Sequence, residues 1–204
     1  MRHRIWIGVV CLVGITVAFA ALGWAGSVIH VPLGASIQAA IDGASDGDTI
    51  VVAAGTFNEN IVVSKSITLQ GAQAGVDPRP SIGGRTGPET VLDASEGSSS
   101  VIRITAANVT IDGFTITGGT GDMVEEGGSA DFLHFANNIL YDDLATSGDE
   151  AIQIKYSTGV TIEYNYAYNI VQDAFNLSAS TNGAVQYNEA HNIHSENAAI
   201  YCYN

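Results

Sequence analysis

Two stretches of the sequence, YNYAYNI at residues 164–170 and YNEAHNI at residues 187–193, share five identities at a constant offset of 23 residues. An earlier copy, FANNILYD at residues 135–142, aligns with the first of these at an offset of 27. VTIDGFTI at residues 109–116 aligns with that copy at an offset of 24, so that Ile111 matches Phe135. Repeats of about 20 to 50 residues are typical of solenoids, in which each unit packs only against its neighbours. The sequence therefore predicts a stack of similar coils.

Short strands, rather than helices, occupy these repeats. Runs of three to five residues rich in Val, Ile and Thr are interrupted by Gly, Asn, Asp and Ser. In Ile152-Gln153-Ile154 a polar residue lies between two apolar ones, as expected for a strand with one buried face. We therefore expect an all-β fold: a right-handed parallel β-helix solenoid of about five coils. Each coil has three short strands, stacked about 4.8 Å above those of the previous coil.

The start of this domain has a different character. Residues 36–44, SIQAAIDGA, predict a short N-terminal capping helix, with Ser36 as its N-cap and Ile37 and Ile41 on one face. Residues 49–57, TIVVAAGTF, then predict the first strand, which ends near Gly55.

Two insertions interrupt the predicted coils. Residues 72–99 are rich in Gly, Ser and Pro and are too long for a tight turn, so we expect a functional or mobile segment there. Residues 120–130 are acidic and rich in Gly. We place the β-helix domain at residues 36–204. Since the sequence stops within a coil and an open coil exposes strand edges, we expect the natural protein to continue beyond residue 204.

The segment SIQAAIDGASDGDTIVVAAGTFNENIVVSKSITLQGA, residues 36–72, resembles the N-terminal part of right-handed parallel β-helix proteins of the pectate-lyase-like superfamily. The shared pattern is a capping helix, GDTI, a GT(F/Y) turn and a KSITLxG strand. The resemblance implies the same fold over about residues 36–204. It implies no single activity, because the superfamily includes polysaccharide lyases, glycoside hydrolases, epimerases, adhesins and surface-layer components.

The composition and the N-terminal segment limit which partners and which cellular compartment the protein can have. Seven basic against 21 acidic residues give a net charge of −14, which argues against a nucleic-acid partner. Residues 1–26 combine a basic start with an uncharged apolar run and an A-x-A-like cleavage signal at Ala18-Phe19-Ala20. They predict a signal peptide or an uncleaved N-terminal anchor, and the anchor would be the protein's contact with a membrane. We expect a secreted or cell-surface protein.

The acidic residues Glu150, Asp173 and Glu196 follow one another at intervals of 23 residues. In a coil of that period they stack along one edge, where carboxylates repel unless they are solvated, protonated or bound to a cation. The spacing therefore suggests a Ca²⁺ site at these three residues, since calcium takes six to eight oxygen ligands. Ordinary hydrated acids in the turn before each strand explain the same pattern.

Catalysis is a further hypothesis for the same region. Carboxylates about 5 to 9 Å apart can hydrolyse a glycosidic bond, and Asp149, Glu150 and Asp173 are the candidate acids. A polysaccharide lyase also needs a base, for which Lys155 and Arg103 are the candidates. Neither lies in a lyase or polygalacturonase signature, so whether the protein is an enzyme stays open.

Asparagines and tyrosines repeat with the coils. We expect Asn138, Asn165 and Asn188 to bond to one another at a bend, with left-handed backbone geometry. The tyrosines of the last coils can pack in columns or offer a platform for sugar rings. Two functions remain: an exported protein that binds or processes a polysaccharide along its lateral face, and a non-catalytic adhesin or surface-layer module.

Overall fold

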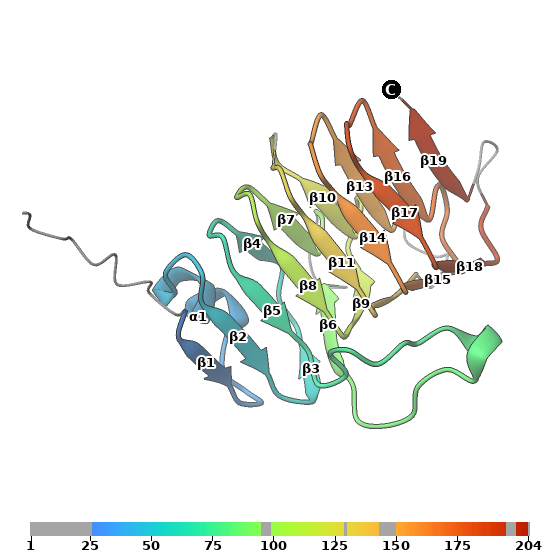
Figure 1. Cartoon of the computed structure of the whole chain (residues 1–204). Helices are drawn as coiled ribbons and strands as arrows, with labels where there is room; N and C mark the ends of the chain where they lie inside the picture. The colour runs from blue at the N-terminus through green and yellow to red at the C-terminus, as the bar shows by residue number, and fades with distance from the viewer. Residues whose placement is uncertain (1–25, 95–98, 129, 143–149, 195–198, 204) are drawn as a thin grey trace, which may run out of the picture.

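The computed structural model describes residues 26–94, 99–128, 130–142, 150–194 and 199–203 (Figure 1). It confirms an all-parallel β-solenoid, in which about six turns stack in a row with strands on three sides. Nearly all of the predicted leader, residues 1–26, lies outside the described part of the chain. Within the described part, none of the helices has the length and apolar character needed to span a bilayer.

Three parallel sheets form the walls of the solenoid. Sheet A consists of β1 (Val28–Val31), β2 (Thr49–Val52), β5 (Thr68–Gln70), β8 (Thr110–Asp112), β11 (His134–Ala136), β14 (Thr161–Glu163) and β17 (Ala184–Gln186). Sheet B consists of β3 (Gly55–Phe57), β6 (Thr90–Ala94), β9 (Phe114–Gly118), β12 (Ile139–Tyr141), β15 (Tyr166–Tyr168) and β18 (Glu189–His191). Sheet C consists of β4 (Ile61–Val63), β7 (Ile102–Ile104), β10 (Val124–Glu126), β13 (Ile152–Lys155), β16 (Phe175–Ser178) and β19 (Ile200–Tyr203).

Apolar side chains form columns inside these walls because equivalent residues of successive coils pair in register. On sheet A one such column contains Ile50, Leu69, Ile111, Phe135 and Ile162. All five are at most 1% exposed. Burial of this kind contributes about 25 cal/mol per Å² of apolar surface, so the columns are the main stabilising term of the fold.

The predicted capping helix is α1 (Ile37–Gly43), and the Ser36 hydroxyl accepts a hydrogen bond from the Ala39 backbone N–H at 3.1 Å. Ile37 and Ile41 are fully buried at the first coil. The single strand predicted for residues 49–57 is instead two, β2 and β3. The chain turns a corner at Ala53 and Ala54, which carry it from sheet A to sheet B.

The acidic insertion predicted for residues 120–130 contains β10, whose Val124 is fully buried and pairs with Ile102 and Ile152. The insertion at 72–99 is described except for residues 95–98. It carries a single 3-10 turn, η1 (Pro80–Ile82), and β6, and extends along the solenoid beside the later coils (Figure 1).

The corner between sheets A and B carries the predicted asparagine ladder. The Asn165 Oδ1 atom accepts hydrogen bonds from Asn138, and the Asn165 Nδ2 atom donates to Asn188 Oδ1 at 3.0 Å. The left-handed backbone expected of these asparagines belongs instead to the preceding residues, such as Tyr164 with φ 56° and Tyr187 with φ 54°. The buried amides therefore replace the backbone bonds that the corner cannot make.

Candidate functional site: a hollow beneath the insertion

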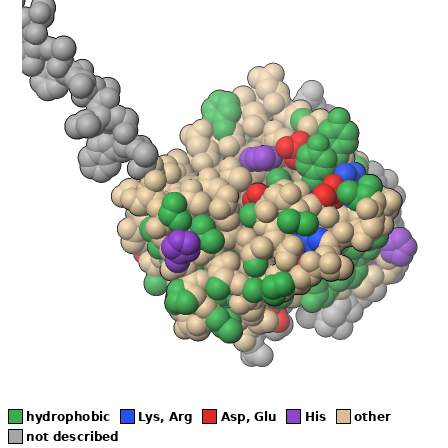
Figure 2. Space-filling model, turned by 60° about the horizontal axis from the view of Figure 1, so that its bottom comes forward, with side chains coloured by type: hydrophobic (Ala, Val, Ile, Leu, Met, Phe, Trp, Pro, Cys, Tyr) green, Lys and Arg blue, Asp and Glu red, His purple; other side chains and the backbone are tan. Residues whose placement is uncertain are grey.

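A hollow of about 360 Å³ lies on the outer face of sheet A, where the insertion crosses it. Its lining includes three carboxylates, a histidine and a tyrosine: Asp77, Asp112, Glu163, His134 and Tyr164. On the face of the molecule that Figure 2 shows, acidic and basic side chains gather mainly in one region, beside apolar side chains. Concave sites with a few convergent polar groups are the usual places for ligands, so this hollow is the candidate binding site.

The strands of sheet A position the polar groups of the hollow. His134 on β11 and Glu163 on β14 lie on adjacent strands, and His134 Nε2 is 3.0 Å from Glu163 Oε1. The other carboxylate oxygen of Glu163 accepts a hydrogen bond from Gln186 Nε2 at 2.8 Å. Asp112 Oδ1 accepts hydrogen bonds from Gly75 N–H and Asn137 Nδ2. These bonds hold the carboxylates in one orientation before any ligand arrives.

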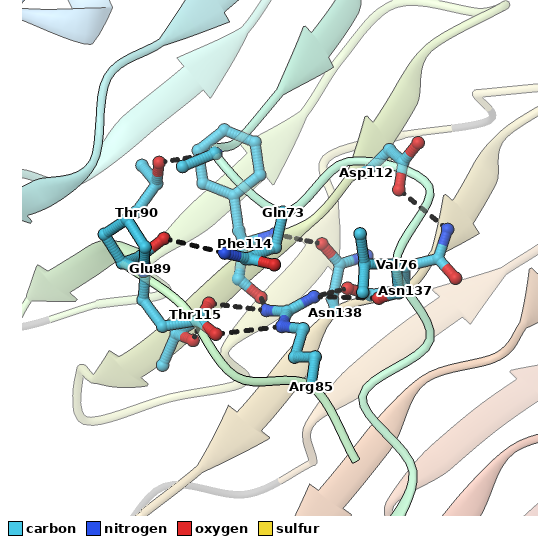
Figure 3. Close-up of polar contacts among 12 residues, drawn as sticks. Gln73, Val76, Arg85, Glu89, Thr90, Asp112, Phe114, Thr115, Asn137 and Asn138 are labelled. Carbon is cyan, nitrogen blue, oxygen red and sulfur yellow. Dashed lines mark hydrogen bonds and ion pairs between the residues drawn. The ribbon is translucent and has the colours of Figure 1, made fainter. Parts of the chain in front are cut away.

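Arg85 fastens the insertion to the solenoid (Figure 3). Its side chain is fully buried and forms a two-point ion pair with Glu89, with Nη2 2.7 Å from Oε2. The guanidinium also donates to the backbone carbonyls of Phe114 and Asn137, and Thr115 Oγ1 donates to Glu89. The insertion, expected to be functional or mobile, is therefore tied at this point to two successive coils.

Aromatic rings border the hollow where the insertion passes the later coils. Tyr164 and Tyr187 stack with their ring centroids 5.1 Å apart, and the Arg79 guanidinium lies 5.3 Å from the Tyr164 centroid. Hydrogen bonds from Arg79 hold the pKa of Asp77 below its usual range. The Tyr187 ring, 58% exposed, offers an apolar face to solvent. This stack provides a surface for a flat apolar ligand face beside carboxylate acceptors.

A second tyrosine group lies on sheet B. Tyr141 and Tyr168 stack at 5.0 Å, and Tyr166 stacks on Tyr168 at 5.1 Å. Burial raises the pKa of Tyr166 and of Tyr168. Like ordinary tyrosines, both hydroxyls are neutral near pH 7 and can donate hydrogen bonds.

The structure brings together two of the predicted acidic residues, on sheet C and away from the hollow. Glu150 and Asp173 both accept hydrogen bonds from the Asn176 amide nitrogen, at 3.2 and 3.3 Å. Asp149 and Glu196 lie outside the described residues. The strands β16 and β19 pair at an offset of 25, as Phe175 with Ile200, so the interval of 23 does not extend to the last coil of sheet C.

The two predicted bases lie at different distances from these acids. Lys155 lies two residues along β13 from Gln153, which pairs with Asn176, so its Cα is about 8 Å from that of Asn176. Arg103 pairs with Glu125 at 3.4 Å and lies three strands from Asn176 in the same register, or about 14 Å away. The catalytic roles of Asp149, Glu150, Asp173, Lys155 and Arg103 therefore stay predictions.

The sequence analysis missed the hollow itself. Asp112, Glu163 and Gln186 share one outward register position of sheet A, and the 23-residue offset between Glu163 and Gln186 was a signal for that row. Nothing in the spacing placed Asp77 there, because it belongs to the insertion rather than to a repeat.

The protein is thus a parallel β-solenoid with a hollow on the outer face of sheet A. Part of the chain is similar to a cell surface glycoprotein of Methanothermus fervidus, with 36% identity over 92 residues. That segment covers 44% of this chain and 13% of the archaeal protein. No protein-family model matches the chain. No solved structure matches it either, so membership of the pectate-lyase-like superfamily stays a prediction.

Proposed function

We propose that this protein is a cell-surface β-solenoid module that binds a polysaccharide in the hollow between sheet A and the insertion. The observation that carries the proposal is the combination of oriented carboxylates with the Tyr164–Tyr187 stack. Sugar hydroxyls donate to carboxylates, and sugar rings present apolar C–H faces to aromatic rings. The name of the archaeal relative supports the cell surface as its location.

Charge favours a neutral polymer over a polyuronate. Three carboxylates line the hollow and Arg79 is engaged by Asp77, so an anionic chain would meet like charges there. The net charge of −14 adds a long-range repulsion. We propose binding rather than cleavage at the hollow because the candidate acids Glu150 and Asp173 and the candidate bases lie on sheet C, away from it.

Binding to a panel of soluble neutral polysaccharides and polyuronates tests this proposal. We expect the wild-type protein to bind a neutral polymer in calorimetry and Tyr187→Ala to weaken that binding at least about tenfold, the loss of one stacking contact of about 1.5 kcal/mol. Tyr156→Ala is the matched control, since Tyr156 is 72% exposed and has φ 58°, close to the 54° of Tyr187. Equal affinities of the two variants, or no binding by the wild type, would overturn the proposal. If the wild type binds no polysaccharide, the remaining function is that of a surface module without this ligand.

A further inference from the structure

The sequence contains two Asn-x-Ser/Thr motifs, Asn108-Val109-Thr110 and Asn176-Leu177-Ser178. This motif is the acceptor for N-linked glycans on the surface of exported proteins. Both motifs overlap a strand of the solenoid, the first β8 and the second β16. The fold gives the two acceptor asparagines opposite surroundings, and these surroundings decide which of them can carry a sugar chain.

Asn108 lies at the corner between sheets C and A with its side chain free. The residue is exposed, and its backbone N–H donates to the Asp131 carbonyl at 2.9 Å. Its side-chain amide makes no hydrogen bond among the described residues. Its left-handed backbone, with φ 56°, is one that asparagine adopts more readily than most residues. The amide nitrogen is therefore open to solvent on the outside of the corner, as a glycan acceptor must be.

The neighbouring coils leave room around Asn108. The register of sheet A puts Ser66 one coil before it and Phe132 one coil after it. The Ser66 side chain is small, and its hydroxyl donates to the Ala107 carbonyl. Phe132 is 57% exposed, and a Cβ at Gly159 in the following coil would lie 2.7 Å from its ring, so the ring leans away from Asn108. A bulky group at this corner therefore projects into solvent.

Asn176 has a closed environment instead. It is 8% exposed, and its Nδ2 atom donates to Glu150 Oε1 at 3.2 Å and to Asp173 Oδ2 at 3.3 Å. Both acids are themselves less than a tenth exposed. A sugar on Nδ2 would remove one of these donors and would need a volume that a close-packed coil does not have. A chain with a glycan at Asn176 could therefore not complete this coil.

We propose that Asn108 carries an N-linked glycan in the folded protein and that Asn176 does not. The inference takes from the proposed function only that the chain is exported. The sugar donor is a lipid-phosphate-linked oligosaccharide, held by a membrane oligosaccharyltransferase. The bond between its anomeric carbon and a phosphate oxygen breaks, and that carbon bonds to Asn108 Nδ2. The lipid phosphate leaves with the electron pair, and one Nδ2 proton is released to solvent. Since Val109 is 1% exposed in the folded chain, the transfer precedes closure of this coil.

The intact mass of the full chain, expressed in the secretory pathway of eukaryotic cells, tests the inference. We expect one glycan per chain, which peptide N-glycosidase releases and peptide mass spectrometry maps to Asn108. Thr110→Ala removes the hydroxyl of the first motif, keeps Asn108 and should abolish the glycan. Ser178→Ala makes the same change in the second motif and is the matched control, since both hydroxyl residues are half-buried in short strands. This control should keep the glycan.

Melting curves of the secreted chains establish that they are folded, and Asn108→Gln is a second variant that should lose the glycan if Thr110→Ala fails to fold. The inference is wrong if the folded wild type carries no glycan, if its glycan maps to Asn176, or if the variants of the first motif keep it. Polysaccharide binding in the hollow is measured separately. A chain glycosylated at Asn108 that binds no polysaccharide would refute the proposed function and leave this inference standing.

Discussion

Asn165 carries the strongest single prediction about the fold, because its buried amide bonds to both of its neighbours in the ladder, Asn138 and Asn188. The residue is fully buried, and its Nδ2 atom donates to the backbone carbonyls of Phe135 and Glu163 and to Asn188 Oδ1, at 2.9 to 3.0 Å. Asn165→Asp keeps the shape of the side chain and replaces this donor with an oxygen. The substitution therefore tests hydrogen bonding without creating a cavity.

The magnitude follows from the loss of the Nδ2 donor. Asn188 Oδ1 keeps the Asn165 N–H and the Glu163 carbonyl keeps the Asn137 N–H, whereas the Phe135 carbonyl loses its side-chain donor and a buried carboxylate comes to face three oxygen atoms. Each buried acceptor left without a partner costs about 1 to 3 kcal/mol, and protonation of the introduced carboxyl can restore one donor. We expect a loss of about 3 to 5 kcal/mol at pH 7, a large fraction of the 5 to 15 kcal/mol typical of folded domains. Burial raises the pKa of the introduced carboxyl in the folded state, so the variant should lose stability as pH rises from about 4 to 7.

Urea unfolding at pH 4 and pH 7 measures this, with the wild type as reference at each pH. Asn192→Asp is the matched control: Asn192 is exposed and its Nδ2 donates to Asn169 at 2.7 Å, so water can replace the bond. The control should cost less than about 1 kcal/mol. A similar loss in both variants, or an Asn165→Asp loss that does not grow between pH 4 and pH 7, would refute the reasoning about the ladder.

Three further changes test other parts of the molecule. Arg85→Met breaks an ion pair whose arginine side chain is fully buried and whose glutamate is 25% exposed, and should cost about 3 kcal/mol in urea unfolding. Arg103→Met removes a half-exposed pair and should cost at most about 1 kcal/mol. Gly113→Ala should lower the melting temperature more than Gly47→Ala: both glycines have positive φ, but a Cβ at Gly113 would overlap the backbone of the insertion and one at Gly47 meets nothing. Backbone hydrogen bonds lower the pKa of Asp48 in the folded protein. The stability that this carboxylate contributes is therefore present above the ordinary carboxyl pKa and is lost as pH falls through the lowered value. Asp48→Asn should make the melting temperature less dependent on pH below about 4, which melting curves at several pH values measure.

The repeat period predicted the solenoid because coil stacking requires the same side chain at the same place in every turn. Ile152 and Phe175 do pair at the 23-residue offset, and Glu150 and Asp173 meet through Asn176. Asp122 Oδ1 accepts a hydrogen bond from the Glu150 backbone N–H, so Asp122 belongs to the same acidic column. The 23-residue spacing did not predict it because the preceding coil is longer, with Val124 and Ile152 pairing at an offset of 28. Spacing finds a column only while successive coils keep the same length.

Sequence by itself determined the class of fold, since the alternation of buried and exposed residues and the regular bends are local properties of the chain. It also determined the ladder, whose asparagines recur with the coils. Only the tertiary structure decided where the insertion lies, because nothing in residues 72–89 repeats and its position depends on Arg85 reaching Phe114 and Asn137 in other coils. Contacts between a non-repeating segment and a distant coil leave no periodic trace, and the candidate site is built from such contacts.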